Sequence, residues 1–317
     1  MSHRSGQPVP MKKIMVWINR GFLTAAMLFA GWFLIKQYDS IRKILVTADI
    51  SGLVLSFSIL VLFVIIQAFL GASVLRTVGG GAPYRITLPI ILTSLLGKYI
   101  PGKIWVVTMR LTSLSRHRIS AATVIASSVI EHVFAISTGL LVFLLSSSDL
   151  DFSLRTLPTT VAVTIFILFI LLPEKVHTLV NRILGILRHE PLPTWPSRGR
   201  SFGYTACYTA NWLILGFGIY ILAGSLIPEL GSLDVVTVSG FYALSVIAGF
   251  FAVFAPGGIG VREGIFVLAL HPYTSAMNAV FVALTIRLVL SIAELTAIGT
   301  VATLAKPKGL SFDPAVD

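Results

Sequence analysis

The sequence contains little cysteine and little charge. Cys207 is the one cysteine among 317 residues, so the chain cannot form an internal disulfide. No Cys/His cluster has the spacing of a zinc site, and we expect no metal and no cofactor. Charged residues make up 12% of the chain, whereas about a quarter of a typical soluble domain is charged. A chain with so few polar groups cannot cover a soluble surface, which excludes a soluble globular protein.

Apolar residues make up 56% of the chain, and the mean hydropathy is +0.91. Runs of about 20 apolar residues match the hydrocarbon core of a bilayer. We therefore expect an all-α polytopic membrane protein, with residues 1–317 forming a single integral membrane domain. A first apolar run that Lys36 follows directly, without a small-residue cleavage site, is typical of an uncleaved span. The six predicted full spans are 21–35, 52–71, 120–146, 157–172, 203–224 and 276–304.

Two further apolar regions are interrupted by proline and glycine. The region 86–109 contains Pro101-Gly102, and the region 235–270 contains Pro256-Gly257-Gly258. Proline removes a backbone donor and glycine weakens a helix, so each region is predicted to split into two half-helices. Non-helical backbone survives at membrane depth only where protein buries it or a wet cavity adjoins it. We interpret both regions as re-entrant hairpins.

The distribution of basic residues predicts the orientation. The formal net charge is +11, from 24 basic and 13 acidic residues. If the N-terminus is cytoplasmic and the hairpins enter from opposite sides, most basic residues lie in cytoplasmic segments, including Arg110, Arg116 and Arg118. Both termini are then cytoplasmic in a multi-pass protein of the cell membrane. The positive charge reflects this orientation beside anionic lipid headgroups, and nucleic acid is not needed to explain it.

The same topology predicts an inverted repeat. Residues 16–146 form one half, and residues 157–304 form an inverted second half that includes a cytoplasmic connector at 174–201. One constant shift along the chain takes Pro101 to Pro256 and Gly102 to Gly257. Inverted repeats with broken helices in corresponding positions are typical of transporters. Within the connector, apolar residues at helical spacing predict an interfacial amphipathic helix over 175–189.

Ionisable residues inside the apolar regions are costly, so they are either structural ion pairs or functional groups. Arg287 and Glu294 lie two turns apart on one helix face, too far to pair with each other. Each is predicted to meet a partner on another helix. Glu131 and His132 are adjacent and thus point about 100° apart, which favours a structural role over a proton relay. The full set is Lys98, Lys103, Glu131, Arg262, Glu263, Arg287 and Glu294.

The two breaks predict a site for an anion. Lys98 and Lys103 flank the first break, and Arg262 and Glu263 follow the second. Half-helix ends present free N–H groups and a positive dipole, which suit a phosphate or carboxylate. The glycines either permit close approach of the backbone or only tight helix packing. We expect an anionic lipid headgroup there. The candidate substrate-binding residues are Lys98, Pro101, Gly102, Lys103, Glu131, Pro256, Gly257, Gly258, Arg262, Glu263, Arg287 and Glu294.

Motifs of catalysis are missing from the sequence. It contains no P-loop, no G-x-S-x-G and no H-E-x-x-H, so no catalytic residue is predicted. Three tryptophans, Trp105, Trp195 and Trp212, are interpreted as anchors at the membrane–water interface.

The two broken segments resemble a known family. Leu96-Gly97-Lys98-Tyr99-Ile100-Pro101-Gly102-Lys103-Ile104-Trp105 and Ala255-Pro256-Gly257-Gly258-Ile259-Gly260-Val261-Arg262-Glu263-Gly264 are similar to the two signature segments of the lysylphosphatidylglycerol synthase transmembrane family. This flippase-like family includes the membrane part of the multiple peptide resistance factor. The resemblance implies a role in moving or presenting an anionic phospholipid or a polyprenyl-linked lipid. It assigns this role first to Pro256, Gly257, Gly258, Arg262 and Glu263.

Full-length synthases of this kind carry a soluble aminoacyl-transferase domain after the membrane part, whereas this chain stops shortly after Lys306. Transfer of an amino acid by this chain alone is therefore not expected. Three hypotheses remain open. The leading one is a lipid flippase. The alternatives are a component of a lipid-modifying lysyltransferase and an accessory scaffold for a separate glycosyltransferase or lipid-modifying enzyme.

Overall fold

In the computed structural model, the described residues are 32, 35–79, 81–100, 104–146, 160, 164, 172–186, 191, 192, 194–252 and 255–304. They form helices and loops, and no strand occurs among them, which confirms the all-α prediction. The predicted spans 21–35 and 157–172 fall almost entirely outside the described residues and stay predictions. Pro101, Gly102 and Lys103 also lie outside them.

In the described part of the chain, four helices are long and apolar enough to cross a membrane. The shortest has 26 residues, or about 39 Å at 1.5 Å per residue, and a bilayer core is about 30 Å thick. Each coincides with one predicted span. The four helices are α3 (Ile50–Thr77), α6 (Ala121–Ser146), α9 (Arg198–Leu226) and α12 (Ala276–Leu304).

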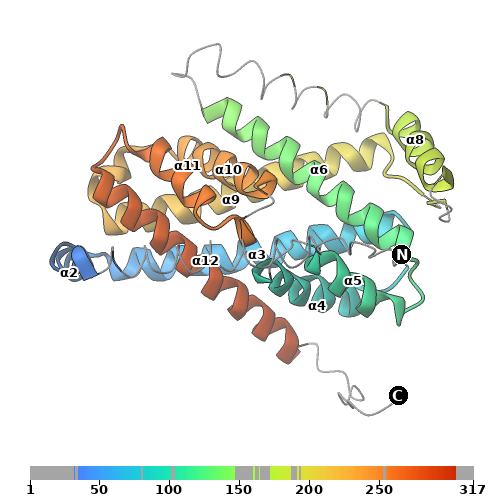
Figure 1. The fold of residues 1–317 in the computed structure, drawn as a ribbon, viewed down its shortest axis with the longest axis horizontal. Helices are drawn as coiled ribbons and strands as arrows, with labels where there is room; N and C mark the ends of the chain where they lie inside the picture. Colours follow the sequence, from blue (N-terminus) through green and yellow to red (C-terminus); the bar gives the residue numbers. More distant parts are fainter. Residues whose placement is uncertain are drawn as a thin grey trace, which may run out of the picture.

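Helices α3 and α9 run antiparallel through the middle of the bundle (Figure 1). At one end, the Asp49 N–H donates to the Ser225 carbonyl over 3.1 Å. At the other end, the Thr77 and Tyr204 hydroxyls lie 2.8 Å apart. The remaining helices pack around this pair, so its two ends define the two ends of the molecule.

The first broken region forms a hairpin of α4 (Tyr84–Ser94), the 3-10 helix η1 (Leu95–Tyr99) and α5 (Trp105–Ser115). Leu75 near the end of α3, Leu114 near the end of α5 and Val124 near the start of α6 share one hydrophobic cluster. The hairpin therefore begins and ends at the same end of the bundle, as a re-entrant hairpin must.

The second broken region begins and ends at the opposite end. It consists of α10 (Val235–Phe251), the 3-10 helix η4 (Pro256–Gly258) and α11 (Val261–Leu270), preceded by η3 (Pro228–Ser232). The Thr274 hydroxyl, just after α11, donates to Glu229 in η3 over 3.3 Å. The Tyr273 ring contacts the Phe241 ring in α10. Figure 1 shows the two hairpins toward different ends of the bundle.

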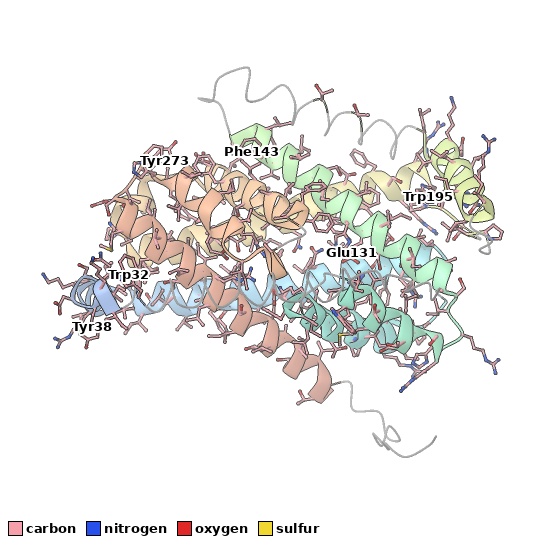
Figure 2. All side chains as sticks on the ribbon, viewed as in Figure 1. Trp32, Tyr38, Glu131, Phe143, Trp195 and Tyr273 are labelled. Carbon is pink, nitrogen blue, oxygen red and sulfur yellow. The ribbon has the colours of Figure 1, made fainter. Side chains whose placement is uncertain are left out.

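Two short helices mark these ends (Figure 1): α2 (Tyr38–Thr47) at one and α8 (Pro173–Ile186) at the other. Val180 and Leu184 of α8 pack against the bundle, while Leu179 and Ile183 are exposed. An amphipathic helix with an exposed apolar edge suits the membrane–water interface, in line with the helix predicted over 175–189. Figure 2 shows Trp32, Tyr38 and Tyr273 towards the α2 end and Trp195 towards the α8 end.

The last residue of α6, Ser146, and the first residue of α8, Pro173, lie far apart. The last turn of α6 contacts α10, because a Cβ on Gly240 would lie 1.9 Å from the Ser146 hydroxyl. This places Ser146 towards the α2 end. Pro173 begins α8 at the other end. Ser146 and Pro173 therefore lie at different ends of the bundle, and the span predicted at 157–172 stays a prediction.

The prediction for Trp212 is wrong. This residue is buried in the middle of α9, where its indole N–H donates to the Ala135 carbonyl over 2.9 Å. Gly139 makes room for the ring, since a Cβ there would lie 3.0 Å from it. A buried indole needs a hydrogen-bond acceptor. α6 supplies one, so Trp212 packs two helices together and does not lie at the interface.

Candidate functional site

The two breaks meet inside the bundle. Helices η1 and η4 touch, and a Cβ on Gly257 would lie 3.4 Å from the Lys98 carbonyl oxygen. The same Cβ would lie 2.9 Å from Nη2 of Arg287 on α12. Predicted site residues from distant parts of the sequence are thus neighbours. We call this cluster the junction and define it as Lys98, Gly257, Gly258, Arg262, Glu263, Arg287 and Glu294.

Two ion pairs hold the junction together. The Lys98 ammonium contacts Oε1 of Glu294, and the Tyr99 hydroxyl donates to Oε2 of the same carboxylate over 2.8 Å. The Arg287 Nε lies 3.8 Å from Oε1 of Glu263. The prediction that Arg287 and Glu294 each pair with another helix is confirmed. Their partners come from α11 and η1.

Glu263 also closes the start of α11. Its Oε2 accepts the Gly260 N–H over 2.6 Å, a hydrogen bond that caps the helix. This backbone donor, which the sequence suggested for a ligand, is therefore already used.

Arg262 pairs with no carboxylate among the described residues. Its Nη2 donates to the Tyr242 hydroxyl over 3.1 Å, and its guanidinium carbon lies 5.5 Å from the Tyr242 ring centre. Its Nε and the Nη2 of Arg287 are buried without a described acceptor. An unsatisfied buried donor costs about 1–3 kcal/mol. The junction thus has three cations, two carboxylates and two N–H groups that lack acceptors.

Glycines provide the space for the arginines. Gly257 and Gly258 have φ angles of 59° and 72°, which other residues rarely adopt. A Cβ on Gly258 would lie 2.9 Å from Cδ of Arg262, and one on Gly249 would lie 2.2 Å from Cγ of Arg262. The sequence predicted the first two glycines but missed Gly249. The available signal was a glycine inside the apolar helix α10.

Glu131 does not belong to the junction. It forms an ion pair of 2.6 Å with Arg110, and their side chains are 8% and 5% exposed. Arg110 also donates to the Ser94 hydroxyl over 3.0 Å and to the Ser128 hydroxyl over 3.3 Å. A Cβ on Gly71 would lie 3.0 Å from the Glu131 carboxylate, so α3 leaves room for it.

The placement of Arg110 in a cytoplasmic segment is therefore wrong. After the first break the chain forms a helix again, and α5 returns through the bundle beside α6. Arg110 lies midway along α5, so it is still inside the protein where the sequence suggested a loop. Figure 2 shows Glu131 in the interior.

His132 faces a different neighbour from Glu131. Its Nδ1 lies 2.7 Å from the Ser128 carbonyl oxygen, and its ring centre lies 5.0 Å from that of Phe250 on α10. Glu131 instead faces α3 and α5. This divergence supports the structural interpretation of the two residues over a proton relay.

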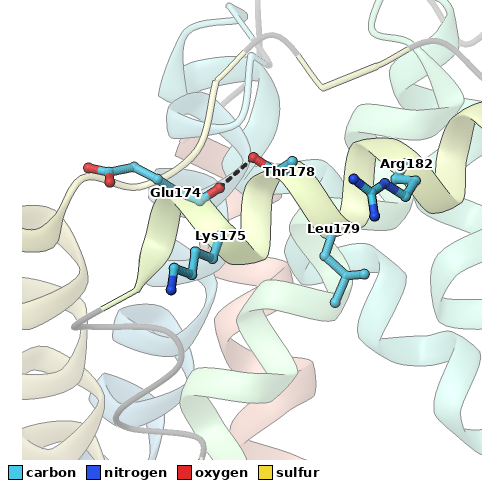
Figure 3. Close-up of a pocket in the computed structure, with 5 residues that line it drawn as sticks. All are labelled: Glu174, Lys175, Thr178, Leu179 and Arg182. Atoms are coloured by element: carbon cyan, nitrogen blue, oxygen red, sulfur yellow. Dashed lines mark hydrogen bonds between the residues drawn. The ribbon is translucent and has the colours of Figure 1, made fainter.

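A shallow pocket lies on α8, away from the junction (Figure 3). Its lining comes from successive turns of this one helix. It is a surface groove between the side chains of one helix, and no residue of another described helix lines it. The lining residues are Glu174, Lys175, Thr178, Leu179 and Arg182.

The fold and the junction define a class: an α-helical, multi-pass membrane protein whose two broken hairpins meet over paired charges inside the helix bundle. The chain belongs to the family described as the lysylphosphatidylglycerol synthase TM region, whose model matches residues 18–298. A search of curated proteins finds no match for the chain.

We expect the Arg110–Glu131 pair to be important for stability. Glu131→Gln leaves the buried guanidinium without its counter-charge, so the free energy of unfolding should fall by about 3–5 kcal/mol. The double variant Arg110→Met/Glu131→Leu should recover part of this loss. Denaturant unfolding in mixed micelles, followed by circular dichroism, measures the change.

The matched control is Glu174→Gln. Glu174 pairs with Arg198 over 3.9 Å, with side chains 84% and 63% exposed, and such exposed pairs contribute about 0–1 kcal/mol. Equal stability of the Glu131→Gln and Glu174→Gln variants would contradict a buried, stabilising pair.

Proposed function

We propose that the junction binds the anionic headgroup of a lipid or lipid-linked intermediate, and that the protein moves this lipid across the membrane. The observation that carries the proposal is Arg262, a cation with no carboxylate partner among the described residues. The surplus charge and the unused N–H groups of Arg262 and Arg287 suit a phosphate oxygen.

A lipid fits the surroundings of the junction better than a soluble anion does. The first break is flanked by the exposed apolar residues Ile100, Ile104 and Trp105. Phe250 and Phe251, at the end of α10 before the second break, are also exposed. In a bilayer such side chains face acyl chains. A headgroup can therefore occupy the junction while its chains lie along these residues.

The packing supports an inverted repeat. In each half, a span is followed by two half-helices and a second span: α3, α4, α5, α6 and then α9, α10, α11, α12. The first half-helix of each half packs against the last span of the other half: α4 packs against α12, and α10 packs against α6. Each half also has an ion pair between its second half-helix and the following span, with the signs reversed: Arg110 with Glu131, and Glu263 with Arg287.

Such a repeat suggests how transport proceeds. Transporters built from inverted repeats bind substrate near the repeat interface and alternate access by rocking one part against the other. The junction combines residues of both halves, Lys98 from the first and Arg262 from the second. Motion of one half against the other would expose it to each membrane leaflet in turn.

We further propose that the α8 end faces the cytoplasm of a cell in whose membrane the protein lies. More of the described basic residues lie there than at the α2 end, where Lys36, Arg42 and Lys43 are accompanied by the acidic Asp39, Asp49, Glu229 and Asp234. The basic residues at the α8 end are Arg76, Arg85, Arg116, Arg118, Lys175, Arg182, Arg198 and Arg200.

Cysteine labelling tests this orientation. In a Cys207→Ser background, we expect an impermeant maleimide to label Ser232→Cys on intact cells. It should label Ser197→Cys only after permeabilisation. Both serines are exposed and lie at opposite ends of α9. The reverse labelling pattern would contradict the proposed orientation.

The transport role depends on Arg262. In proteoliposomes with a fluorescent anionic phospholipid, the wild-type protein should make inner-leaflet lipid accessible to an impermeant quencher. Arg262→Ala should reduce this rate at least about tenfold, because the loss of one charge-assisted hydrogen bond costs about 1.5–3 kcal/mol. Arg262→Lys, which keeps the charge, should retain part of the rate.

The matched control is Arg182→Ala, which removes an arginine from α8 far from the junction and should leave transport unchanged. Wild-type transport that persists in Arg262→Ala would contradict the assignment of the site. If the wild-type protein binds the lipid without moving it, transport is wrong, and the scaffold or lysyltransferase-component hypotheses gain support.

A further inference from the structure

We propose that the Glu294 carboxylate is an internal substitute for the anionic ligand. It binds Lys98 and Tyr99 in the structure and yields them to an arriving headgroup. The exchange releases η1 from α12. This inference rests on the proposed anion site at the junction, and it assigns a positioning role to Glu294.

The Glu294 contact differs from the other ion pairs in what it joins. Within the described bundle, the Arg110–Glu131 pair links α5 to α6, and the Arg287–Glu263 pair links α12 to α11, so each lies inside one half. The Lys98–Glu294 pair instead links η1 of the first half to α12 of the second. Any movement of one half against the other at this place must break it.

Three side-chain interactions build this contact. Lys98 and Tyr99 both donate to the Glu294 carboxylate, and the Tyr99 hydroxyl also lies 3.1 Å from the Ser291 hydroxyl, one turn earlier on α12. We call Lys98, Tyr99, Ser291 and Glu294 the inter-half contact. Two adjacent residues of the first hairpin thus hold two successive turns of α12.

The inter-half contact is more accessible than the pair inside the first half. The Lys98 and Glu294 side chains are 26% and 13% exposed, against 5% and 8% for Arg110 and Glu131. A pair that retains access to its surroundings can exchange partners at lower cost than a fully buried one. Glu294 is therefore suited to release, whereas Glu131 is suited to a permanent role.

A phosphate headgroup can replace the Glu294 carboxylate as the hydrogen-bond acceptor of Lys98 and Tyr99. Its oxygens accept the same hydrogen bonds from the Lys98 ammonium and the Tyr99 hydroxyl. They also offer acceptors to the Arg262 Nε and the Arg287 Nη2, which have none in the described structure. The Lys98 carbonyl and the Arg287 Nη2 both lie beside Gly257. The junction has three cations and two carboxylates, so a singly charged headgroup would make its net charge zero.

The first test measures affinity. Glu294→Gln removes the competing charge, so the variant should bind short-chain phosphatidylglycerol about tenfold more tightly than the wild-type protein, as measured by native mass spectrometry in detergent. Glu174→Gln, which removes an exposed carboxylate on α8, should bind with wild-type affinity. A purely structural Glu294 predicts the opposite direction, so equal or weaker binding by Glu294→Gln overturns the proposal.

The second test measures the contact without any ligand. Spin labels at Ser115→Cys on α5 and Thr300→Cys on α12, in a Cys207→Ser background, report the distance between the halves; both positions are exposed. Glu294→Gln should broaden or shift the distance distribution in the lipid-free protein, and Glu174→Gln on α8 should leave it unchanged. An unchanged distribution in Glu294→Gln overturns the proposal.

The two proposals can fail separately. If the wild-type protein binds no anionic lipid, the proposed function fails. The spin-label distances still decide whether Glu294 joins the halves.

Discussion

Charge inside a hydrocarbon layer must be partnered, and this constraint determines how the helices of this protein meet. Among the described residues inside the bundle, the carboxylates Glu131, Glu263 and Glu294 each contact a cation on another helix. Two of these pairs fix a half-helix to the following span, and one fixes the two halves to each other. Arg262 is the exception, because an aromatic ring and a hydroxyl are its partners. Function is therefore best sought where the pairing is incomplete.

The non-helical backbone is subject to the same constraint, because its peptide groups also need partners inside the membrane. Unpaired peptide groups are as costly in lipid as unpaired charges, so the breaks persist only where protein surrounds them. In this fold the two breaks meet each other, and α12 lies beside both. The glycines that permit the turns at Gly257 and Gly258 also leave the volume that the arginines fill. The broken helices and the intramembrane charges therefore lie together at the junction.

Much of this arrangement could be predicted from the sequence, and the failures have a common physical cause. The lengths of apolar runs and the Pro-Gly breaks correctly indicated four spans and the two broken regions, and the spacing of Arg287 and Glu294 indicated partners on other helices. The depth of Arg110, the burial of Trp212 and the contacts of Tyr99, Tyr242 and Gly249 were not predicted. Lipid and protein interior are both apolar, so the pattern of polarity does not show which face of such a helix packs inward.

The surplus cation at the junction is proposed to bind an anionic headgroup. Native mass spectrometry can compare the lipids on the protein purified from its own membrane with those on Arg262→Ala prepared in the same way. The wild-type protein should carry an anionic lipid that Arg262→Ala lacks, while neutral lipids remain equal on both. The same anionic lipid at the same occupancy on both proteins would contradict the account.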